Sequence, residues 1–265
     1  ELVEGKCPIH TNRELEIINE ENYFFAFSKF QKSLLDFYKE RPDFVVPQFR
    51  YNEIIAFVER GLEDFSISIL KSKMPWGISV PDDTDHVMYV WFDALVNYIS
   101  TLGWGSQSDD NFKKYWLTGS PTQYCGKDNT RFQAVMWQAM LMAAGVKNSY
   151  QIVVDGHITA EGGVKMSKTL GNVVDPKEIS AEYGIDALRY FLLREISSFE
   201  DSPFTKERFK EAYNANLANG LGNLVSRIMK MAADNLEEPA EIPEWEDMTE
   251  YFNIFETFDL KKAAD

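Results

Sequence analysis

Two lysines three residues apart, Lys165 and Lys168, stand in the run VKMSKTLGN between Gly162-Gly163 and Gly171. Lysine carries a compact charge on a long flexible stem, so a glycine-flanked loop of this kind can bring two ammonium groups onto a polyphosphate. A solvated Lys/Ser loop would explain any one of these residues but explains the whole run poorly. The run therefore predicts a phosphate clamp in which Lys165 and Lys168 are catalytic.

A carboxylate candidate lies in Gly126-Lys127-Asp128, between a predicted strand and a predicted helix. Open α/β sheets bind ligands beyond the carboxyl ends of their strands. Asp128 could accept hydrogen bonds from two ribose hydroxyls, and Gly126 would let the backbone approach a nucleotide. Asp128 could equally be a helix N-cap. His157, near another strand end, is typical of a structural histidine but is close enough to the lysine loop to touch a nucleotide.

The segment 89–98, YVWFDALVNY, is the candidate for substrate selection. Trp91, Ala94 and Tyr98 could line a pocket in which bulky rings surround a small residue. Such a pocket suits a flexible, polarizable side chain such as a thioether. An aromatic stripe of this kind belongs more often to a core, so the segment predicts a pocket only in combination with other motifs.

Together these motifs resemble the methionine-type class I aminoacyl-tRNA synthetases of bacteria. The lysine run resembles the signature KMSKS, and GKD, the aromatic segment, CPIH at 7–10, NYFF at 22–25, DFSIS at 64–68 and PWG at 75–77 extend the resemblance over nearly the whole chain. The resemblance implies an aminoacyl-tRNA ligase that activates L-methionine with ATP and Mg²⁺ and transfers it to tRNA(Met). A branched-chain (Ile, Leu or Val) synthetase and a catalytically defective tRNA-binding paralogue are the alternatives.

The resemblance also assigns site residues. It implies ATP binding by Gly126, Asp128, His157, Lys165, Met166, Ser167, Lys168 and Thr169, and methionine binding by Trp91, Ala94, Leu95, Tyr98, Asn129 and Gln133. Three positions depart from the family pattern: Ile69 stands where an arginine is frequent, Asn129 where an aliphatic residue is usual, and Gln133 where histidine is usual. The HIGH-type signature of the first half of the fold is absent. The chain is therefore expected to be part of a longer protein and inactive in isolation.

Cys7 and His10 have the spacing of a metal knuckle, but two ligands do not complete a tetrahedral zinc site. The resemblance implies that they are the last two ligands of a Zn²⁺ site in the full-length protein. With two cysteines and no signal peptide, the sequence predicts a reducing, cytoplasmic location. No apolar stretch reaches membrane-spanning length, so no membrane partner is expected.

The net charge of −15 argues against nucleic acid, but binding uses local patches. Residues 205–231 hold five basic and two acidic residues, whereas 234–250 hold eight acidic residues and no basic ones. Asn223 and Arg227 lie four apart, on one face of a predicted helix. Such a pair can read an unstacked RNA loop, and the resemblance assigns it to the tRNA anticodon. We expect no DNA partner.

The elements that must position these residues alternate between strand and helix. Strands are predicted at 87–92, 115–118, 123–125 and 151–154, the first as a central strand buried on both faces. Helices are predicted at 27–39, 53–60, 130–144, 186–196, 206–235 with an interruption at Gly220 and Gly222, and 251–264. Strand 123–125, helix 130–144 and strand 151–154 read as a βαβ unit of a parallel sheet.

These elements and the resemblance imply an α/β fold. It would be the carboxyl-terminal half of a class I synthetase Rossmann-type nucleotide-binding fold, followed by the start of an α-helical anticodon-binding bundle. The expected division has four parts: 1–80, the remainder of a connective insertion with the zinc-knuckle end; 81–160, the second half of the Rossmann-type domain; 161–204, the KMSKS loop and stem-contact region; and 205–265, the first, incomplete helices of the anticodon-binding domain.

Overall fold

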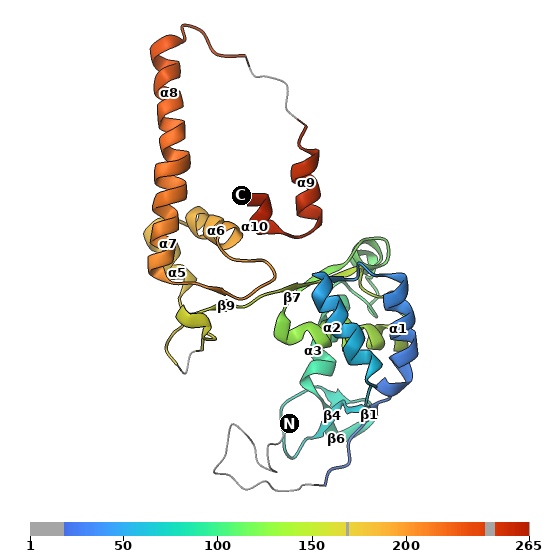
Figure 1. Cartoon of the computed structure of the whole chain (residues 1–265). Coiled ribbons are helices and arrows are strands. Elements are labelled where there is room, and N and C mark those ends of the chain that lie inside the picture. The colour runs from blue at the N-terminus through green and yellow to red at the C-terminus, as the bar shows by residue number, and fades with distance from the viewer. Residues whose placement is uncertain (1–18, 168–169, 242–246, 265) are drawn as a thin grey trace.

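A computed structural model describes residues 19–167, 170–241 and 247–264 (Figure 1). It is a mixed α/β structure, as the sequence predicts, with an α/β part at one end and a helical part at the other. Among the described residues, no helix combines the length and the apolar character needed to cross a membrane.

A three-stranded parallel sheet forms the centre of the α/β part. Its order is β2 (Val45–Val46), β8 (Gln151–Asp155) and β7 (Thr122–Gly126). The run Ile152–Val154 is fully buried, which is typical of a parallel strand covered on both faces. The predicted strands at 123–125 and 151–154 and their parallel pairing are confirmed.

The crossover between β7 and β8 is helical, as predicted for 130–144. It begins as the 3-10 turn η3 (Lys127–Asn129) and continues as the π-helix η4 (Phe132–Met136) and α4 (Trp137–Ala143). The predicted helix at 27–39 is the 3-10 turn η1 (Phe27–Phe30) followed by α1 (Gln31–Glu40), and the helix predicted at 53–60 begins earlier, as α2 (Gln48–Glu59). Side chains of α1, α2, η4 and the sheet share the first hydrophobic core.

The strand predicted at 87–92 is wrong in extent and in place. Only its first two residues lie in a strand, β6 (Asp83–Met88), which is the central strand of an antiparallel sheet with β4 (Ser68–Leu70) and β5 (Ser79–Val80). Helix α3 (Val90–Ser100) follows Tyr89. A short apolar run does not by itself distinguish a strand from a buried helix. Trp91, Ala94, Leu95 and Tyr98 therefore lie on a helix. A short antiparallel pair of β1 (Phe24–Phe25) and β3 (Phe65–Ser66) precedes this sheet.

The strand predicted at 115–118 is also wrong, because residues 115–117 are the last residues of the π-helix η2 (Phe112–Leu117) and Thr118 is its C-cap. Phe112 and Trp116 are buried at helical spacing and pack with α3 and α4 in a second core. Aromatic and β-branched residues favour strands only where a neighbouring strand is available.

The helical part begins with α5 (Pro176–Tyr183), which Asp175 caps, and α6 (Ile185–Arg194), the helix predicted at 186–196. Helices α7 (Lys206–Ala212), η6 (Tyr213–Gly222) and α8 (Asn223–Asn235) follow one another directly and form one long rod. The predicted interruption at Gly220 and Gly222 is thus wrong, because both glycines keep helical hydrogen bonding in the π-helical turns. The root of the rod packs with α5 and α6 in a third core.

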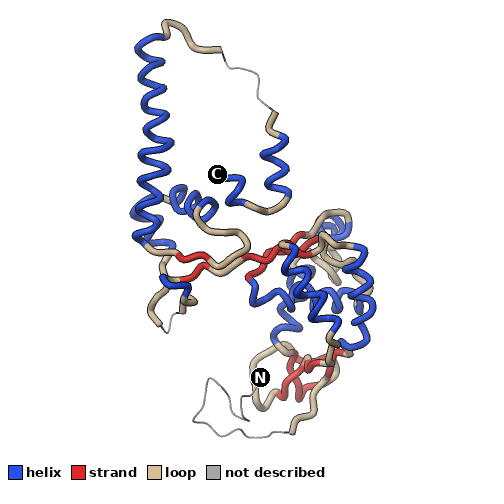
Figure 2. The backbone as a smooth tube through the Cα atoms, in the orientation of Figure 1, coloured by secondary structure: helices blue, strands red, loops and turns tan. Residues whose placement is uncertain are grey.

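Two further features complete the helical part. The helix predicted at 251–264 is divided into α9 (Thr249–Glu256) and α10 (Leu260–Ala264), since Phe258 adopts a left-handed conformation (φ 59°) between them. Strand β9 (Ile158–Thr159) pairs in parallel with β10 (Ser202–Pro203), and Figure 2 shows this pair on the path between the α/β part and the helices. The segment that leads into the long rod is therefore paired with the segment that leads into the lysine loop.

A candidate nucleotide and amino-acid site

Oppositely charged side chains meet at the carboxyl ends of β7 and β8. Lys165 Nζ lies 2.6 Å from Asp128 Oδ2, and His157 Nε2 lies 3.5 Å from the same oxygen. The bond from Lys165, aided by the charges of His157 and Lys127, lowers the pKa of the Asp128 carboxyl. The Lys165 and Asp128 side chains are 70% and 56% exposed, so an incoming ligand can reach both.

The strand ends explain why Asp128 and His157 are neighbours. Gly126 is the last residue of β7 and pairs with Asp155 of β8, so the residues that follow each strand emerge side by side. A Cβ on Gly126 would lie 3.7 Å from the His157 ring, which is ordinary contact distance. Gly126, Asp128 and His157 therefore lie close together at this end of the sheet.

A narrow turn brings Lys165 back to this site. Thr159 forms a β-bridge with Lys165, and Ala160 N donates to Val164 O at 2.8 Å. Gly162 and Gly163 close the turn with φ values of 71° and 77°, which favour glycine. The glycine pair thus shapes the turn that carries Lys165.

Asn172 organises the lysine loop itself. Its Oδ1 accepts from Ser167 N at 2.8 Å, and its Nδ2 donates to Lys165 O at 3.3 Å. The two sides of the loop are therefore joined by one amide, with Gly171 (φ 65°) providing the turn. Met166 and Ser167 are half-buried, and the predicted residues Lys168 and Thr169 lie outside the described residues.

Asp201 is a member of the site that the sequence analysis did not single out. Its Oδ2 is 2.6 Å from Lys127 Nζ, and its Oδ1 accepts from His157 N at 3.0 Å. The bond from Lys127 lowers the pKa of the Asp201 carboxyl. Asp201 is 74 residues from Lys127 in sequence, so no local pattern could have revealed the pair. Lys127, Asp128, His157, Lys165 and Asp201 together are called the charge cluster below.

The predicted amino-acid side of the site lies on α3 and on the crossover. The Trp91 ring stacks on Phe132, with centroids 4.2 Å apart. Gln133 Nε2 donates to the Tyr98 hydroxyl at 2.8 Å. Trp91, Tyr98 and Gln133 are therefore tied to the same crossover helix, whose first turn carries Asn129 and Asp128.

Two of the predicted pocket residues behave differently. Leu95 is 1% exposed and packs in the second core, whereas Ala94 is exposed and borders a hollow with Ile78, Asp93 and Asn97. Phe132 and Trp137 were not predicted from the sequence. Trp137 is buried, and its ring centroid lies 6.2 Å from that of Tyr98. Trp137 follows Gln133 by four residues, the spacing of one helix face, which is the signal that could have found it.

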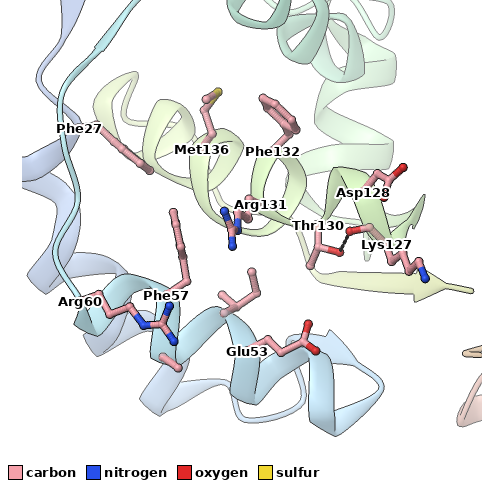
Figure 3. A pocket seen from close by; sticks show the side chains of 12 residues that line it. Phe27, Glu53, Phe57, Arg60, Lys127, Asp128, Thr130, Arg131, Phe132 and Met136 are labelled. Atoms are coloured by element: carbon pink, nitrogen blue, oxygen red, sulfur yellow. Dashed lines mark hydrogen bonds between the residues drawn. The ribbon is translucent and has the colours of Figure 1, made fainter. Parts of the chain in front are cut away.

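A cavity of about 690 Å³ opens between α2 and the start of the crossover helix (Figure 3). Phe57 and Arg131 both line it and contact each other, with the Arg131 guanidinium 4.4 Å from the centroid of the Phe57 ring. Asp128 and Lys127 stand at its rim, beside Thr130. Of the charge cluster, Lys127 and Asp128 are among the lining residues, so the cluster borders this cavity.

The remaining predicted residues are separate from the charge cluster. Asn223 and Arg227 are exposed on α8, in the long rod of the helical part. Ile69 lies in β4, paired with Val87. Cys7 and His10 lie outside the described residues, and within the described part of the chain no three His, Cys, Asp or Glu side chains gather as a metal site.

Comparison with known proteins identifies the family. A family model described as tRNA synthetases class I (M) matches residues 1–229. The chain is 48% identical over 231 residues to the methionine–tRNA ligase of Caldanaerobacter subterraneus, covering 87% of this chain and 35% of that protein. It is 46% identical over 239 residues to the methionine–tRNA ligase of Thermosynechococcus vestitus, covering 88% and 44%.

A solved structure agrees with these relatives. The crystal structure of Mycobacterium tuberculosis methionyl-tRNA synthetase bound by methionyl-adenylate matches with a TM-score of 0.83 and 37% identity, over 92% of this chain and 50% of that one. The chain thus spans between about a third and a half of the proteins it matches. It belongs to the class I (M) family of tRNA synthetases.

Proposed function

We propose that this chain is part of a methionyl-tRNA synthetase that activates L-methionine with ATP and transfers it to tRNA(Met). The single observation that carries the proposal is the contact of Lys165 with Asp128 at the ends of the parallel strands, beside the crossover helix that bears Trp91's stacking partner and Gln133. On neighbouring elements, this arrangement offers a carboxylate that can accept hydrogen bonds from ribose, an ammonium group that can donate to phosphates, and aromatic rings that can contact the amino-acid side chain.

In the first step the methionine carboxylate would attack the α-phosphorus of Mg²⁺-bound ATP, and pyrophosphate would leave. The ribose hydroxyls would donate to Asp128 and release Lys165 toward the phosphates, where Lys168 would join it. Two ammonium groups aimed at charge that develops in the transition state supply catalysis without an acid–base pair. Gly126, His157, Met166, Ser167 and Thr169 would complete the contacts to ATP.

The methionine side chain would lie against Trp91 and Tyr98, with Ala94, Leu95, Asn129 and Gln133 completing the pocket. A thioether fits such a lining because it is flexible and polarizable. In the second step the terminal ribose hydroxyl of tRNA would take the methionyl group, while Asn223 and Arg227 read the anticodon. Their exposed positions, four residues apart on α8, leave the amide and the guanidinium accessible to RNA bases.

We further propose the division into 1–80, 81–160, 161–204 and 205–265 given above, a cytoplasmic location, and Zn²⁺ in the full-length protein with Cys7 and His10 as two of its ligands. Metal analysis of the full-length protein tests the last point.

Amino-acid-dependent ATP–pyrophosphate exchange by the full-length protein tests the proposed function. We expect exchange with methionine and none with isoleucine, leucine or valine. Exchange with a branched-chain amino acid instead would show the alternative synthetase. Absence of exchange with every amino acid, together with retained tRNA binding, would show the defective paralogue, which Ile69 and Gln133 favour.

A further inference from the structure

A chain of neutral polar side chains is buried beneath Tyr98. Gln123, Gln133, Gln138 and Ser149, called the amide relay below, are 6%, 4%, 0% and 2% exposed. Their hydrogen bonds form one continuous path from the segment before β8, through strand β7 and the crossover helix, to the Tyr98 hydroxyl. Buried polar groups of this kind are satisfied only in one arrangement of donors and acceptors.

Backbone groups fix the orientation at the far end of the relay. Gln138 Oε1 accepts from Ser149 N at 3.1 Å, and Gln138 Nε2 donates to Gln133 O at 2.9 Å. A backbone N–H can only donate and a carbonyl can only accept, so the Gln138 amide cannot be reversed without losing both bonds. Asn148 Nδ2 adds a second donor to Gln138 Oε1 at 3.1 Å.

The orientation then passes from one side chain to the next. Gln138 Nε2 donates to Ser149 Oγ at 3.1 Å, which leaves the Ser149 hydroxyl proton for Gln123 Oε1. Gln123 must therefore turn its Nε2 toward Gln133 Oε1, which it meets at 2.9 Å. Gln133 in turn presents Nε2 to the Tyr98 oxygen at 2.8 Å.

Tyr98 has one hydroxyl proton, and this arrangement leaves it unused. The Tyr98 oxygen accepts from Gln133, and among the described residues the structure has no acceptor for the Tyr98 O–H. If the relay were reversed, Gln133 Oε1 would accept this proton. The Tyr98 oxygen could then only accept a hydrogen bond from a ligand and not donate one. Tyr98 as a whole residue is 36% exposed, so a ligand can contact its side chain.

We infer that Gln123 and Ser149 are specificity-determining positioning residues, because they keep the Tyr98 hydroxyl as a hydrogen-bond donor for an acceptor atom in the substrate side chain. The inference rests on the proposed function, in which that atom is the thioether sulfur. A sulfur is a weak acceptor, so the relay would favour methionine over an isosteric aliphatic side chain by a modest factor rather than exclude the latter.

Norleucine, in which a methylene replaces the sulfur, is the probe. ATP–pyrophosphate exchange by the full-length protein gives kcat/KM for methionine and for norleucine, and their ratio is the readout. Tyr98→Phe removes the hydroxyl donor, and the fall of the ratio in this variant is the reference for the other variants. Ser149→Ala removes the proton that orients Gln123, and we expect the ratio to fall about three- to tenfold, with KM for ATP unchanged.

Gln123→Glu is the sharper variant, because a carboxylate accepts only. Gln133 would then turn its Nε2 toward residue 123 and its Oε1 toward Tyr98, consuming the Tyr98 proton. We expect a loss of preference as large as that of Tyr98→Phe, which recovers at low pH as the carboxyl protonates. Ser68→Ala removes a buried hydroxyl outside the relay and should leave the ratio unchanged.

A ratio in Ser149→Ala within twofold of wild type, in a protein that still activates methionine, would overturn the inference even if Gln123→Glu did not fold. An unchanged ratio in Tyr98→Phe would overturn it as well. Absence of methionine-dependent exchange in the wild type would overturn the proposed function and this inference together. Exchange by the wild type with an unchanged ratio in the variants would overturn this inference alone, so the two failures are distinguishable.

Discussion

The charge cluster lies at the start of the crossover helix, whereas the amide relay uses Gln133 and Gln138 from its middle, and the two are built on opposite principles. The charge cluster has ionised side chains at an accessible surface, with the Lys165 and Asp128 side chains 70% and 56% exposed. The amide relay has neutral side chains that are at most 6% exposed. An exposed ion pair contributes little to stability and exchanges readily for a ligand, whereas a buried, satisfied amide chain is rigid and costly to break.

The difference suggests a division of labour. Under the proposed function, a nucleotide would rearrange the charge cluster, since contacts to ribose or phosphate would replace its ion pairs. The amide relay would stay unchanged while methionine binds. Variants of the charge cluster should therefore change the rate and nucleotide binding with little effect on stability. Variants of the amide relay should lower stability or change amino-acid specificity with little effect on nucleotide binding.

The largest effect is expected for Lys165→Met. The loss of one donor aimed at transition-state charge should lower kcat of ATP–pyrophosphate exchange by roughly 10²–10³-fold, with KM for methionine and the thermal midpoint nearly unchanged. Lys177→Met, at the start of the nearby helix α5, removes an exposed lysine outside the site and is the matched control. Retention of more than a fifth of the wild-type kcat would place Lys165 outside the chemistry.

Gln138→Leu tests the other region. It keeps the volume but leaves Ser149 N and Asn148 Nδ2 without their shared acceptor. We expect the free energy of unfolding to fall by about 1–3 kcal/mol, since unpaired buried donors carry their full desolvation cost. The thermal midpoint of the full-length protein measures this, with the exposed Gln48→Leu as control. A midpoint equal to that of the control would contradict the rigidity assigned to the relay.

Asp201→Asn should have a smaller, kinetic effect. It removes the charge that holds Lys127 while leaving an acceptor for His157 N, so Asp128 loses part of its support. We expect KM for ATP to rise about three- to tenfold, as for the loss of one charge-assisted bond, with kcat and KM for methionine unchanged.

A double-mutant cycle with Lys127→Met separates positioning from general damage. If Asp201 acts through Lys127, the double variant should be no worse than the more affected single variant. Strictly additive effects would show that the two side chains act independently.

The same contrast explains what the sequence could predict. Lys165, Asp128 and Gly126 could be predicted because each belongs to a short local motif, GKD at 126–128 or the lysine run at 164–172. The parallel pairing of β7 and β8 followed from two short apolar runs separated by a helical pattern. Asp201 and the relay were not identified, since their members are 74 and up to 26 residues apart and meet only through tertiary packing.

The errors have a related cause. Residues 87–92 were predicted as a strand because a continuous apolar run satisfies either a buried strand or a buried helix, and the turn at Tyr89 depends on the neighbouring antiparallel sheet. Gln133 counted as a departure from the family's histidine. A neutral imidazole and an amide each offer one donor and one acceptor face, so the amide relay could run in the same direction with either residue, which no single-sequence pattern could show.

Asp155 lies at the strand end beside the charge cluster and gives the smallest expected effect. It ends β8, opposite Gly126, and burial raises the pKa of its carboxyl to about 6. Because this folded-state pKa lies above the unfolded value, the folded protein binds the proton more tightly. The stabilising contribution of the neutral carboxyl is complete below about pH 4 and is lost as pH rises through about 6.

Asp155→Asn should therefore be more stable than wild type at pH 7 and equal to it near pH 4. Since the group is only partly buried, solvent screening reduces the difference to roughly 1 kcal/mol, or about 2–4 °C in the thermal midpoint. Thermal melts of both proteins between pH 4 and pH 8 measure this difference. A difference that grows up to about pH 6 and then levels off would show that burial holds the carboxyl of Asp155 neutral at the edge of the proposed nucleotide site. A pH-independent difference would show instead that Asp155 behaves like the exposed charges of the cluster.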